Sequence, residues 1–273
     1  MPGRVAVRDH RRALEVSAEI EHGLANGEFG IVCQPQVSLE SGAIVAAEAL
    51  ARWTTADGVR LPAAFIPDAE RSGLIVPLGT QVFELAARRA AVLSRLVPQR
   101  PFVMWVNLSA RQVLESDVVG LVERTMRNTG AAPEHLGVEI TETLLLIDEL
   151  HARWVLHELR ELGLGVALDD FGTGYSSMLY LKHFDFDVLK LAREFVHDLP
   201  TDHIDRTIVK AAVDVAHALG LQTVAEGIET ETQLHAAHDV GCDIGQGYLL
   251  GRPMTAAALK TALLSAAQVG ARP

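Results

Sequence analysis

The chain has 273 residues, 49% of them apolar, and a formal net charge of −11. This apolar content is sufficient for a sizeable core and excludes a predominantly disordered protein. The acidic balance and the lack of basic runs argue against a nucleic-acid-binding or anionic-membrane surface. If the substrate is itself a phosphate anion, bound divalent cations are the obvious means of reversing the negative field locally.

The two cysteines, Cys33 and Cys242, lie far apart and in no zinc-binding spacing, which is typical of buried thiols in a reducing compartment. The N-terminus lacks the apolar segment of a signal peptide, and no stretch approaches the ~18 consecutive apolar residues of a membrane span. The sequence therefore predicts a cytoplasmic protein with no membrane span.

Residues 1–23 are predicted to form a polar N-terminal extension and a lead-in amphipathic helix, which ends near Gly27. Apolar strands are predicted at residues 29–37 and 43–50, joined by a five-residue loop. A parallel crossover needs about a dozen residues or more, so this short loop predicts an antiparallel hairpin.

The following segments alternate between helix and short apolar strand, and several of the helices end in a glycine: Gly130, Gly163, Gly220 and Gly241. The strands are predicted at residues 102–107, 136–141, 164–169, 187–191, 221–226 and 243–249. This pattern favours an α/β fold, a (β/α)8 TIM-type barrel with an antiparallel first strand, over an open doubly wound sheet. Residues 24–265 contain no long linker and are predicted to form one domain, followed by a C-terminal tail at 266–273.

Polar residues collect at the C-terminal ends of these strands, where barrel enzymes assemble their sites. They are Glu48, Asn107, Glu139, Asp169, Asp170, Lys190, Glu226 and Gln246. One acidic residue in such a place is usually a helix cap or a solvated charge, but several carboxylates at one barrel mouth would repel each other unless cations neutralised them. All-oxygen ligands favour two divalent cations, Mg²⁺ or Mn²⁺, over zinc. Asp169 could bridge the two ions, an arrangement suited to phosphodiester hydrolysis.

The same residues carry a resemblance to a known family. In order, the motifs are Glu48-Ala49-Leu50 with Arg52, Asn107-Leu108-Ser109, Glu139-Ile140-Thr141-Glu142, Asp169-Asp170-Phe171-Gly172-Thr173-Gly174-Tyr175-Ser176-Ser177, Glu226-Gly227-Ile228-Glu229 and Gln246-Gly247. Together they resemble the successive signatures of the EAL domain, collinearly from about Leu24 to Met254.

The resemblance implies hydrolysis of cyclic di-GMP to linear pGpG by in-line attack of water at a two-metal site. It assigns Glu48, Asn107, Glu139 and Asp169 to the first ion, and Asp169, Asp170 and Glu226 to the second. Asp170 and Glu226 then form the catalytic group with Lys190, which would orient the attacking water or help to deprotonate it.

The resemblance also implies that Arg52, Gln34 and Gln246 contact the substrate and its surroundings. It assigns the loop containing Gly172, Thr173 and Gly174, which Glu142 holds in place, to the coupling of a homodimer contact to metal occupancy; Glu229 belongs to the same supporting group. A homodimer and a signalling-protein partner are therefore expected.

One position departs from the family pattern. Ala192 follows Lys190-Leu191 where the family usually has an aspartate, so an acidic group near the active site is missing. Because the expected ligand set is otherwise complete, this change is interpreted as the loss of a supporting residue that slows turnover or shifts metal affinity. The main alternative to an enzyme is a degenerate EAL domain that binds cyclic di-GMP without cleaving it and passes the signal to a partner. A protein-interaction barrel with no nucleotide role and a one-metal enolate enzyme are more distant alternatives.

Overall fold

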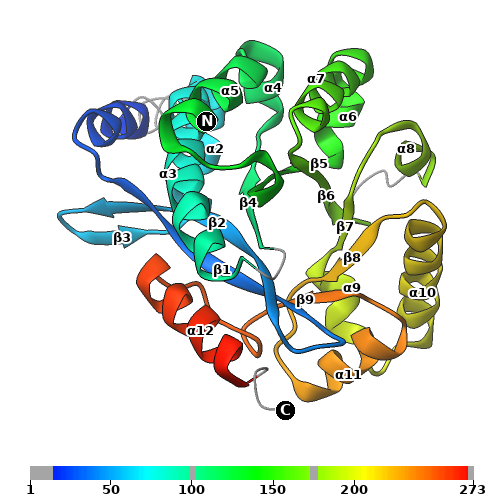
Figure 1. The fold of residues 1–273 in the computed structure, drawn as a ribbon. Helices are drawn as coiled ribbons and strands as arrows, with labels where there is room; N and C mark the ends of the chain where they lie inside the picture. Colours follow the sequence, from blue (N-terminus) through cyan, green and yellow to red (C-terminus); the bar gives the residue numbers. More distant parts are fainter. Residues whose placement is uncertain (1–14, 99–101, 173–177, 270–273) are drawn as a thin grey trace, which may run out of the picture.

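The computed structural model describes residues 15–98, 102–172 and 178–269. In these residues eight strands close into a barrel surrounded by helices (Figure 1). The closed ring runs in the order β1-β2-β4-β5-β6-β7-β8-β9 and back to β1, and β1 is antiparallel to both of its neighbours while the other pairs are parallel. The predicted TIM-type barrel with an antiparallel first strand is thus confirmed.

The strands are β1 (Phe29–Ser38), β2 (Ile44–Thr55), β3 (Gly58–Arg60), β4 (Val103–Asn107), β5 (Leu136–Thr141), β6 (Gly165–Phe171), β7 (Val188–Leu191), β8 (Gln222–Ala225) and β9 (Ile244–Gln246). A helix at 15–25 precedes them. The later α-helices are α2 (Ile66–Ser72), α3 (Ile75–Leu93), α4 (Ala110–Glu115), α5 (Val118–Thr129), α6 (Glu142–Ile147), α7 (Glu149–Glu161), α8 (Met178–His183), α9 (Arg193–Asp198), α10 (His203–Ala218), α11 (Glu231–Asp239) and α12 (Ala256–Val269). Short 3₁₀ turns lie at Pro62–Ala64, Ser94–Leu96 and Pro133–His135.

The strand boundaries differ from the prediction mainly in β2. This strand was expected to end at residue 50, but β1 pairs with it as far as Phe29 opposite Trp53, and pairing with β3 extends it to Thr55. The short β3, which was not predicted although Asp57-Gly58 is a hairpin-turn signal, pairs with the end of β2. Glu48 therefore lies within a strand and does not close one.

Glycines end the helices as the sequence predicted. Gly130 caps α5 at φ 69°, a left-handed conformation that residues with a side chain rarely adopt. The other predicted helix-ending glycines, Gly163, Gly220 and Gly241, also have positive φ. Each of these glycines lies between the end of a helix and the start of the next barrel strand.

Two apolar clusters hold the barrel together. The large one fills the space between the strands and the surrounding helices. A smaller one lies inside the ring and includes Trp105 and Val224. The Trp105 ring rests where Gly137 and Gly165 have no side chain, because a Cβ on Gly137 would lie 2.2 Å from the ring and one on Gly165 2.9 Å.

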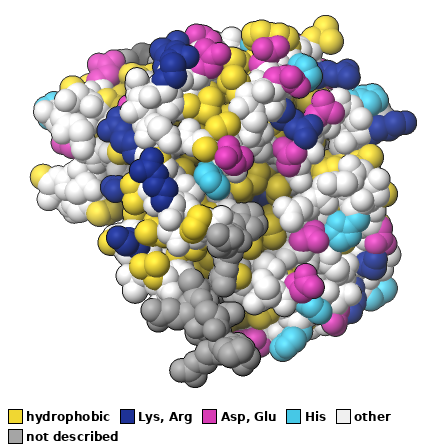
Figure 2. Space-filling view, viewed as in Figure 1, with side chains coloured by type: hydrophobic (Ala, Val, Ile, Leu, Met, Phe, Trp, Pro, Cys, Tyr) yellow, Lys and Arg dark blue, Asp and Glu magenta, His cyan; other side chains and the backbone are white. Residues whose placement is uncertain are grey.

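The surface agrees with the composition. Figure 2 shows acidic, basic and histidine side chains mixed over α10 and α11, without a continuous basic patch there. Cys33 and Cys242 are buried free thiols, and burial raises the pKa of each, to about 11 for Cys33 and about 12 for Cys242. No helix in the described part of the chain is both long and apolar enough to cross a bilayer.

Candidate active site

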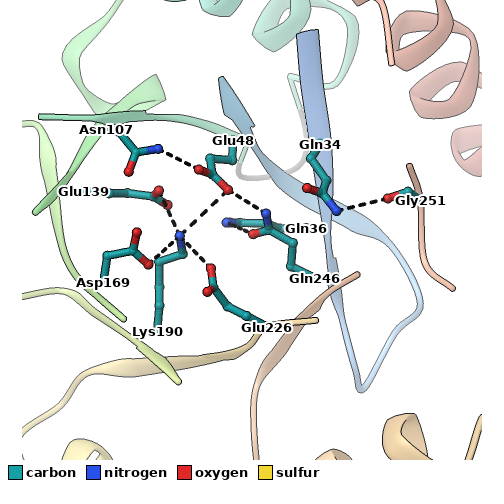
Figure 3. Close-up of polar contacts among 10 residues, drawn as sticks. All are labelled: Gln34, Gln36, Glu48, Asn107, Glu139, Asp169, Lys190, Glu226, Gln246 and Gly251. Atoms are coloured by element: carbon teal, nitrogen blue, oxygen red, sulfur yellow. Dashed lines mark hydrogen bonds and ion pairs between the residues drawn. The ribbon is translucent and has the colours of Figure 1, made fainter. Parts of the chain in front are cut away.

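The Lys190 ammonium lies at the centre of a carboxylate cluster inside the barrel (Figure 3). From β7, its Nζ lies 2.9 Å from Glu139 Oε2, 2.8 Å from Asp169 Oδ1, 2.8 Å from Glu226 Oε1 and 3.9 Å from Glu48 Oε2. Its side chain is 1% exposed and that of Glu139 is fully buried. Residues from β2, β5, β6, β7 and the end of β8 are thus brought to one point, as the sequence predicted.

Glu48 is held by two neutral amides. Asn107 Nδ2 donates to Glu48 Oε1 over 2.6 Å, and Gln246 Nε2 donates to Glu48 Oε2 over 2.6 Å. Since the amide nitrogen of Asn107 faces Glu48, its oxygen is the atom left to bind a cation. Both ends of the Gln246 amide are in use, so its predicted contact with substrate stays a prediction.

A bulge in β6 brings two neighbouring aspartates to the same site. Successive side chains of a regular strand point to opposite faces, so Asp169 and Asp170 should diverge. However, the pairing of β6 with β7 shifts register between Leu168 and Phe171, and Asp170 adopts a positive φ of 53°. As a result, carboxylate oxygens of Asp169, Asp170 and Glu226 lie within 4.8 Å of one another.

The proton affinities in the cluster reflect burial and crowding. Burial raises the pKa of Glu139 well above its ordinary value, even though Lys190 opposes the shift. Burial also raises the pKa of Asp170, with help from Asp169. Burial by itself would lower the pKa of Lys190. The surrounding carboxylates, led by Glu139 and Glu226, together outweigh burial, so the pKa is well above its ordinary value. Lys190 therefore remains an ammonium, which favours its orienting role over proton abstraction.

The donor set fits hard divalent cations. The five carboxylates of Glu48, Glu139, Asp169, Asp170 and Glu226 face a single ammonium, so two divalent cations would cancel the remaining charge. Glu139 Oε1 is buried and accepts no hydrogen bond from any described residue. A buried oxygen of this kind is a suitable ligand atom for Mg²⁺ or Mn²⁺.

A groove of about 1090 Å³ opens beside the cluster. It is lined mainly by residues of α2, α3 and α4, and it reaches the cluster at Asn107, at Thr141 and at the segment of β2 that follows Glu48. Near it, Arg52 donates to the Ala51 carbonyl oxygen over 2.8 Å. Burial lowers the pKa of Arg52, and the nearby Tyr248 and Glu48 only partly oppose this shift. The groove provides space for a ligand much larger than a single phosphate.

The supporting residues lie on neighbouring turns. The Gly172 amide donates to Glu142 Oε1 over 3.3 Å, which ties the end of β6 to the start of α6. Glu229 accepts a hydrogen bond from Arg193 Nη2 over 2.9 Å at an exposed position. Thr173 and Gly174 lie outside the described residues.

The family model for the EAL domain matches residues 17–253 of this chain. The chain belongs to the EAL domain family. The resemblance seen in the sequence motifs is confirmed, and the carboxylate cluster lies at the end of the EAL barrel where the motif residues converge.

Two relatives of this EAL domain are named as cyclic di-GMP phosphodiesterases. Over 89% of its length the chain is 37% identical to MucR of Pseudomonas aeruginosa, a bifunctional diguanylate cyclase/cyclic di-GMP phosphodiesterase, of which it covers 36%. Over 90% of its length it is 35% identical to the cyclic di-GMP phosphodiesterase NbdA of the same organism, of which it covers 32%. The chain thus spans about a third of the length of these curated relatives.

Two solved structures of EAL proteins have the same fold as this chain. The PaMucR phosphodiesterase in complex with c-di-GMP superposes with a TM-score of 0.84 at 36% identity, covering 90% of this chain and 99% of that one. The EAL structure of Bd1971 in its cGMP-bound form superposes with a TM-score of 0.88 at 27% identity, covering 95% of this chain and 72% of that one.

Gln36 is a supporting residue of the cluster that was not predicted from the sequence. Its Nε2 donates to Gln246 Oε1 over 2.7 Å, so it supports the amide that holds Glu48. A signal for it exists in the sequence, because Gln34 and Gln36 are two apart and share one face of β1. Gln34 itself faces the Gly251 carbonyl oxygen at 3.4 Å (Figure 3).

The metal-free EAL domain is expected to lose stability as the pH rises from about 5 to 7.5. Burial raises the pKa of Glu226 from 4.5 to about 7, so the folded state binds a proton that the unfolded state has released. The resulting stability is fully present below pH 4.5 and is lost as the pH passes about 7. Thermal unfolding in chelator should show a smaller fall across this range for Glu226→Gln than for the unaltered chain. An equal fall in melting temperature with pH in both proteins would contradict the assignment of the raised pKa to Glu226.

Proposed function

We propose that this chain hydrolyses one 3′–5′ phosphodiester bond of cyclic di-GMP and releases linear pGpG. The observation that carries the proposal is the convergence of Glu48, Asn107, Glu139, Asp169 and Glu226 at one barrel opening, around Lys190 and beside a large groove. The activities of the named relatives support the same substrate.

The cofactors in this proposal are two divalent cations, Mg²⁺ or Mn²⁺. The proposed ligands of the first are Glu48, Asn107, Glu139 and Asp169, and those of the second are Asp169, Asp170 and Glu226. When bound, such ions lower the pKa of water and stabilise the charge that develops on phosphate and leaving-group oxygens. The buried, unpartnered Glu139 Oε1 and the close oxygens of Asp169, Asp170 and Glu226 support this assignment.

The protein side chains orient the reactants. Lys190 lies within 2.9 Å of three carboxylates, which matches the three N–H donors of its ammonium group. It is therefore proposed to hold these carboxylates in position and, through them, to orient water. Arg52 at the rim is proposed to bind a phosphate oxygen, as guanidinium groups do in a planar, bidentate manner. Gln34 and Gln246 are proposed to support the ligand and its surroundings.

The decisive experiment is incubation of the purified chain with cyclic di-GMP and Mn²⁺, with and without chelator, followed by separation of the nucleotides. The proposal expects pGpG only when the metal is present, and no product from Glu48→Gln, which serves as the inactive control. Tight binding of cyclic di-GMP without product would instead support a receptor.

The receptor alternative is favoured by one observation, Ala192. This residue is fully buried two positions after Lys190 and is the N-cap of α9, yet no side chain caps the helix there. The position therefore lacks both a carboxylate near the cluster and a helix cap. A non-hydrolysing EAL domain would tolerate this loss, whereas an enzyme should turn over more slowly because of it.

Ala192→Asp is accordingly expected to raise the rate of hydrolysis, by about tenfold if the carboxylate acts on the site as outer ligand-supporting groups do. An aspartate at this N-cap should also add about 1 kcal/mol of stability. Ala192→Ser separates the two effects, since serine caps the helix without adding charge. The same rate and metal requirement in all three proteins would show that the position is neutral.

A homodimer through α6 and α7 is part of the proposal. Leu146, Ile147, Leu150 and Trp154 are 50%, 58%, 80% and 54% exposed, forming an apolar strip that begins in the helix of Glu142. Glu142 contacts Gly172 at the end of β6, so a partner subunit on this strip would lie close to the metal-binding strand. Such burial of apolar side chains would stabilise the pair.

Leu150→Glu is expected to convert the dimer into a monomer in analytical ultracentrifugation at tens of micromolar protein, with the fold retained. Leu264→Glu, a change at an exposed leucine of α12, is the control and should leave the dimer intact. A monomeric unaltered chain would contradict the proposed interface. A cytoplasmic location and a signalling-protein partner complete the proposal.

A further inference from the structure

A second cavity, of about 350 Å³, lies at the opposite end of the barrel from the carboxylates. The first residues of several strands line it, among them Val103 of β4, Val188 of β7 and Gln222 of β8. Its inner wall is apolar, formed by Val45, Val103, Trp105, Val188 and Val224. Because Trp105 is fixed against Gly137 and Gly165, this wall has a rigid aromatic component.

Gln36 presents an unused hydrogen-bond acceptor beside this cavity. The carboxylate of Glu48 can only accept, so Gln246 must turn its nitrogen to Glu48 and its oxygen to Gln36. Gln36 must then turn its own nitrogen to Gln246. The orientation of both amides is therefore determined, and Gln36 Oε1 is left without a partner among the described residues, although Gln36 is only 1% exposed.

The surroundings restrict what can satisfy this oxygen. A buried water needs two to four polar partners, and the inner wall offers few besides Gln36. A cavity of ~150 Å³ with apolar walls already accommodates benzene, so this one has room for a larger ring. At the mouth, Glu40 and Asp243 are acidic, which disfavours an anion.

We propose that this cavity is a binding site for a small neutral molecule with an apolar, ring-containing body and one N–H or O–H group, which donates a hydrogen bond to Gln36 Oε1. The donor extends the chain of hydrogen bonds from Gln36 through Gln246 to Glu48. Since hydrogen bonds in a chain polarise one another, an occupant at the far end of the barrel would strengthen the hydrogen bond that Gln246 donates to Glu48, a carboxylate of the proposed metal site. The binding itself does not depend on hydrolysis.

Two fluorinated probes test this site by ¹⁹F NMR titration. 4-Fluorophenol carries an O–H donor, and in 4-fluoroanisole that donor is methylated. The unaltered chain is expected to bind 4-fluorophenol roughly fivefold more tightly, the effect of one buried hydrogen bond. Gln36→Met should abolish this preference, whereas Gln34→Met, a matched change two residues away that does not line the cavity, should retain it.

Ala46→Leu locates the probes, because Ala46 lines the cavity and the larger side chain fills it; neither probe should bind this variant. Circular dichroism reports whether each variant folds. If Gln36→Met is unfolded, the proposal is tested by the relative affinity of the two probes for the unaltered chain and by the loss of binding in Ala46→Leu. A cavity that takes neither probe and holds only water, equal affinity for both probes, or binding that persists in folded Ala46→Leu would each overturn the proposal.

Discussion

Replacing Lys190 by methionine is expected to lower the rate of cyclic di-GMP hydrolysis by roughly 10²–10⁴-fold, the usual effect of removing a group that positions or transfers protons at the reacting centre. The same change should destabilise the metal-free protein by up to about 3–5 kcal/mol, because it leaves buried carboxylates without their cation. Glu139 is the most affected, since its side chain is fully buried against the ammonium.

Metal binding distinguishes this role from a purely structural one. The ammonium repels divalent cations, so Lys190→Met should bind Mn²⁺ no more weakly than the unaltered chain while turnover is lost. Mn²⁺ affinity is measured by electron paramagnetic resonance and turnover by product formation. Lys210→Met, which removes an exposed lysine paired with Asp214, is the control. Activity within threefold of the unaltered chain in Lys190→Met would contradict the central role of the ammonium.

Asp169→Asn is expected to remove activity by about 10³-fold or more, because Asp169 is the proposed ligand shared by both cations. The asparagine has the size of the aspartate but not its charge, so Mn²⁺ affinity should fall at least ~100-fold. The metal-free protein should not lose much stability, since the change removes one of several mutually repelling carboxylates.

Asp170→Asn provides the comparison. It changes a neighbouring aspartate that is proposed to bind only one cation and that is more exposed than Asp169. Its effect on Mn²⁺ affinity should be smaller than that of Asp169→Asn. The reverse order of affinities, measured at one pH, would refute the proposal that Asp169 is the shared ligand.

The barrel could be predicted in some detail because each part of it leaves a local pattern. Apolar strands, helix-ending glycines such as Gly130 and the short loop after the first strand each follow from residues close together in the sequence. The limit of β2 could not be predicted in this way. Its extension to Trp53 depends on pairing with β1 as far as Phe29, a contact between residues more than twenty positions apart.

The side chains proposed for the site could be selected from the sequence, because the carboxyl ends of parallel strands meet at one end of a barrel. Their arrangement relative to one another could not be predicted, because it depends on contacts across the barrel. A bulge in β6 places the side chains of Asp169 and Asp170 at the same site. Lys190 of β7 contacts Glu139 of β5 and Glu226, which follows β8. The orientation of the Gln36 and Gln246 amides follows from the acceptor Glu48 on β2. These features depend on distances across the barrel, which short-range sequence patterns do not encode.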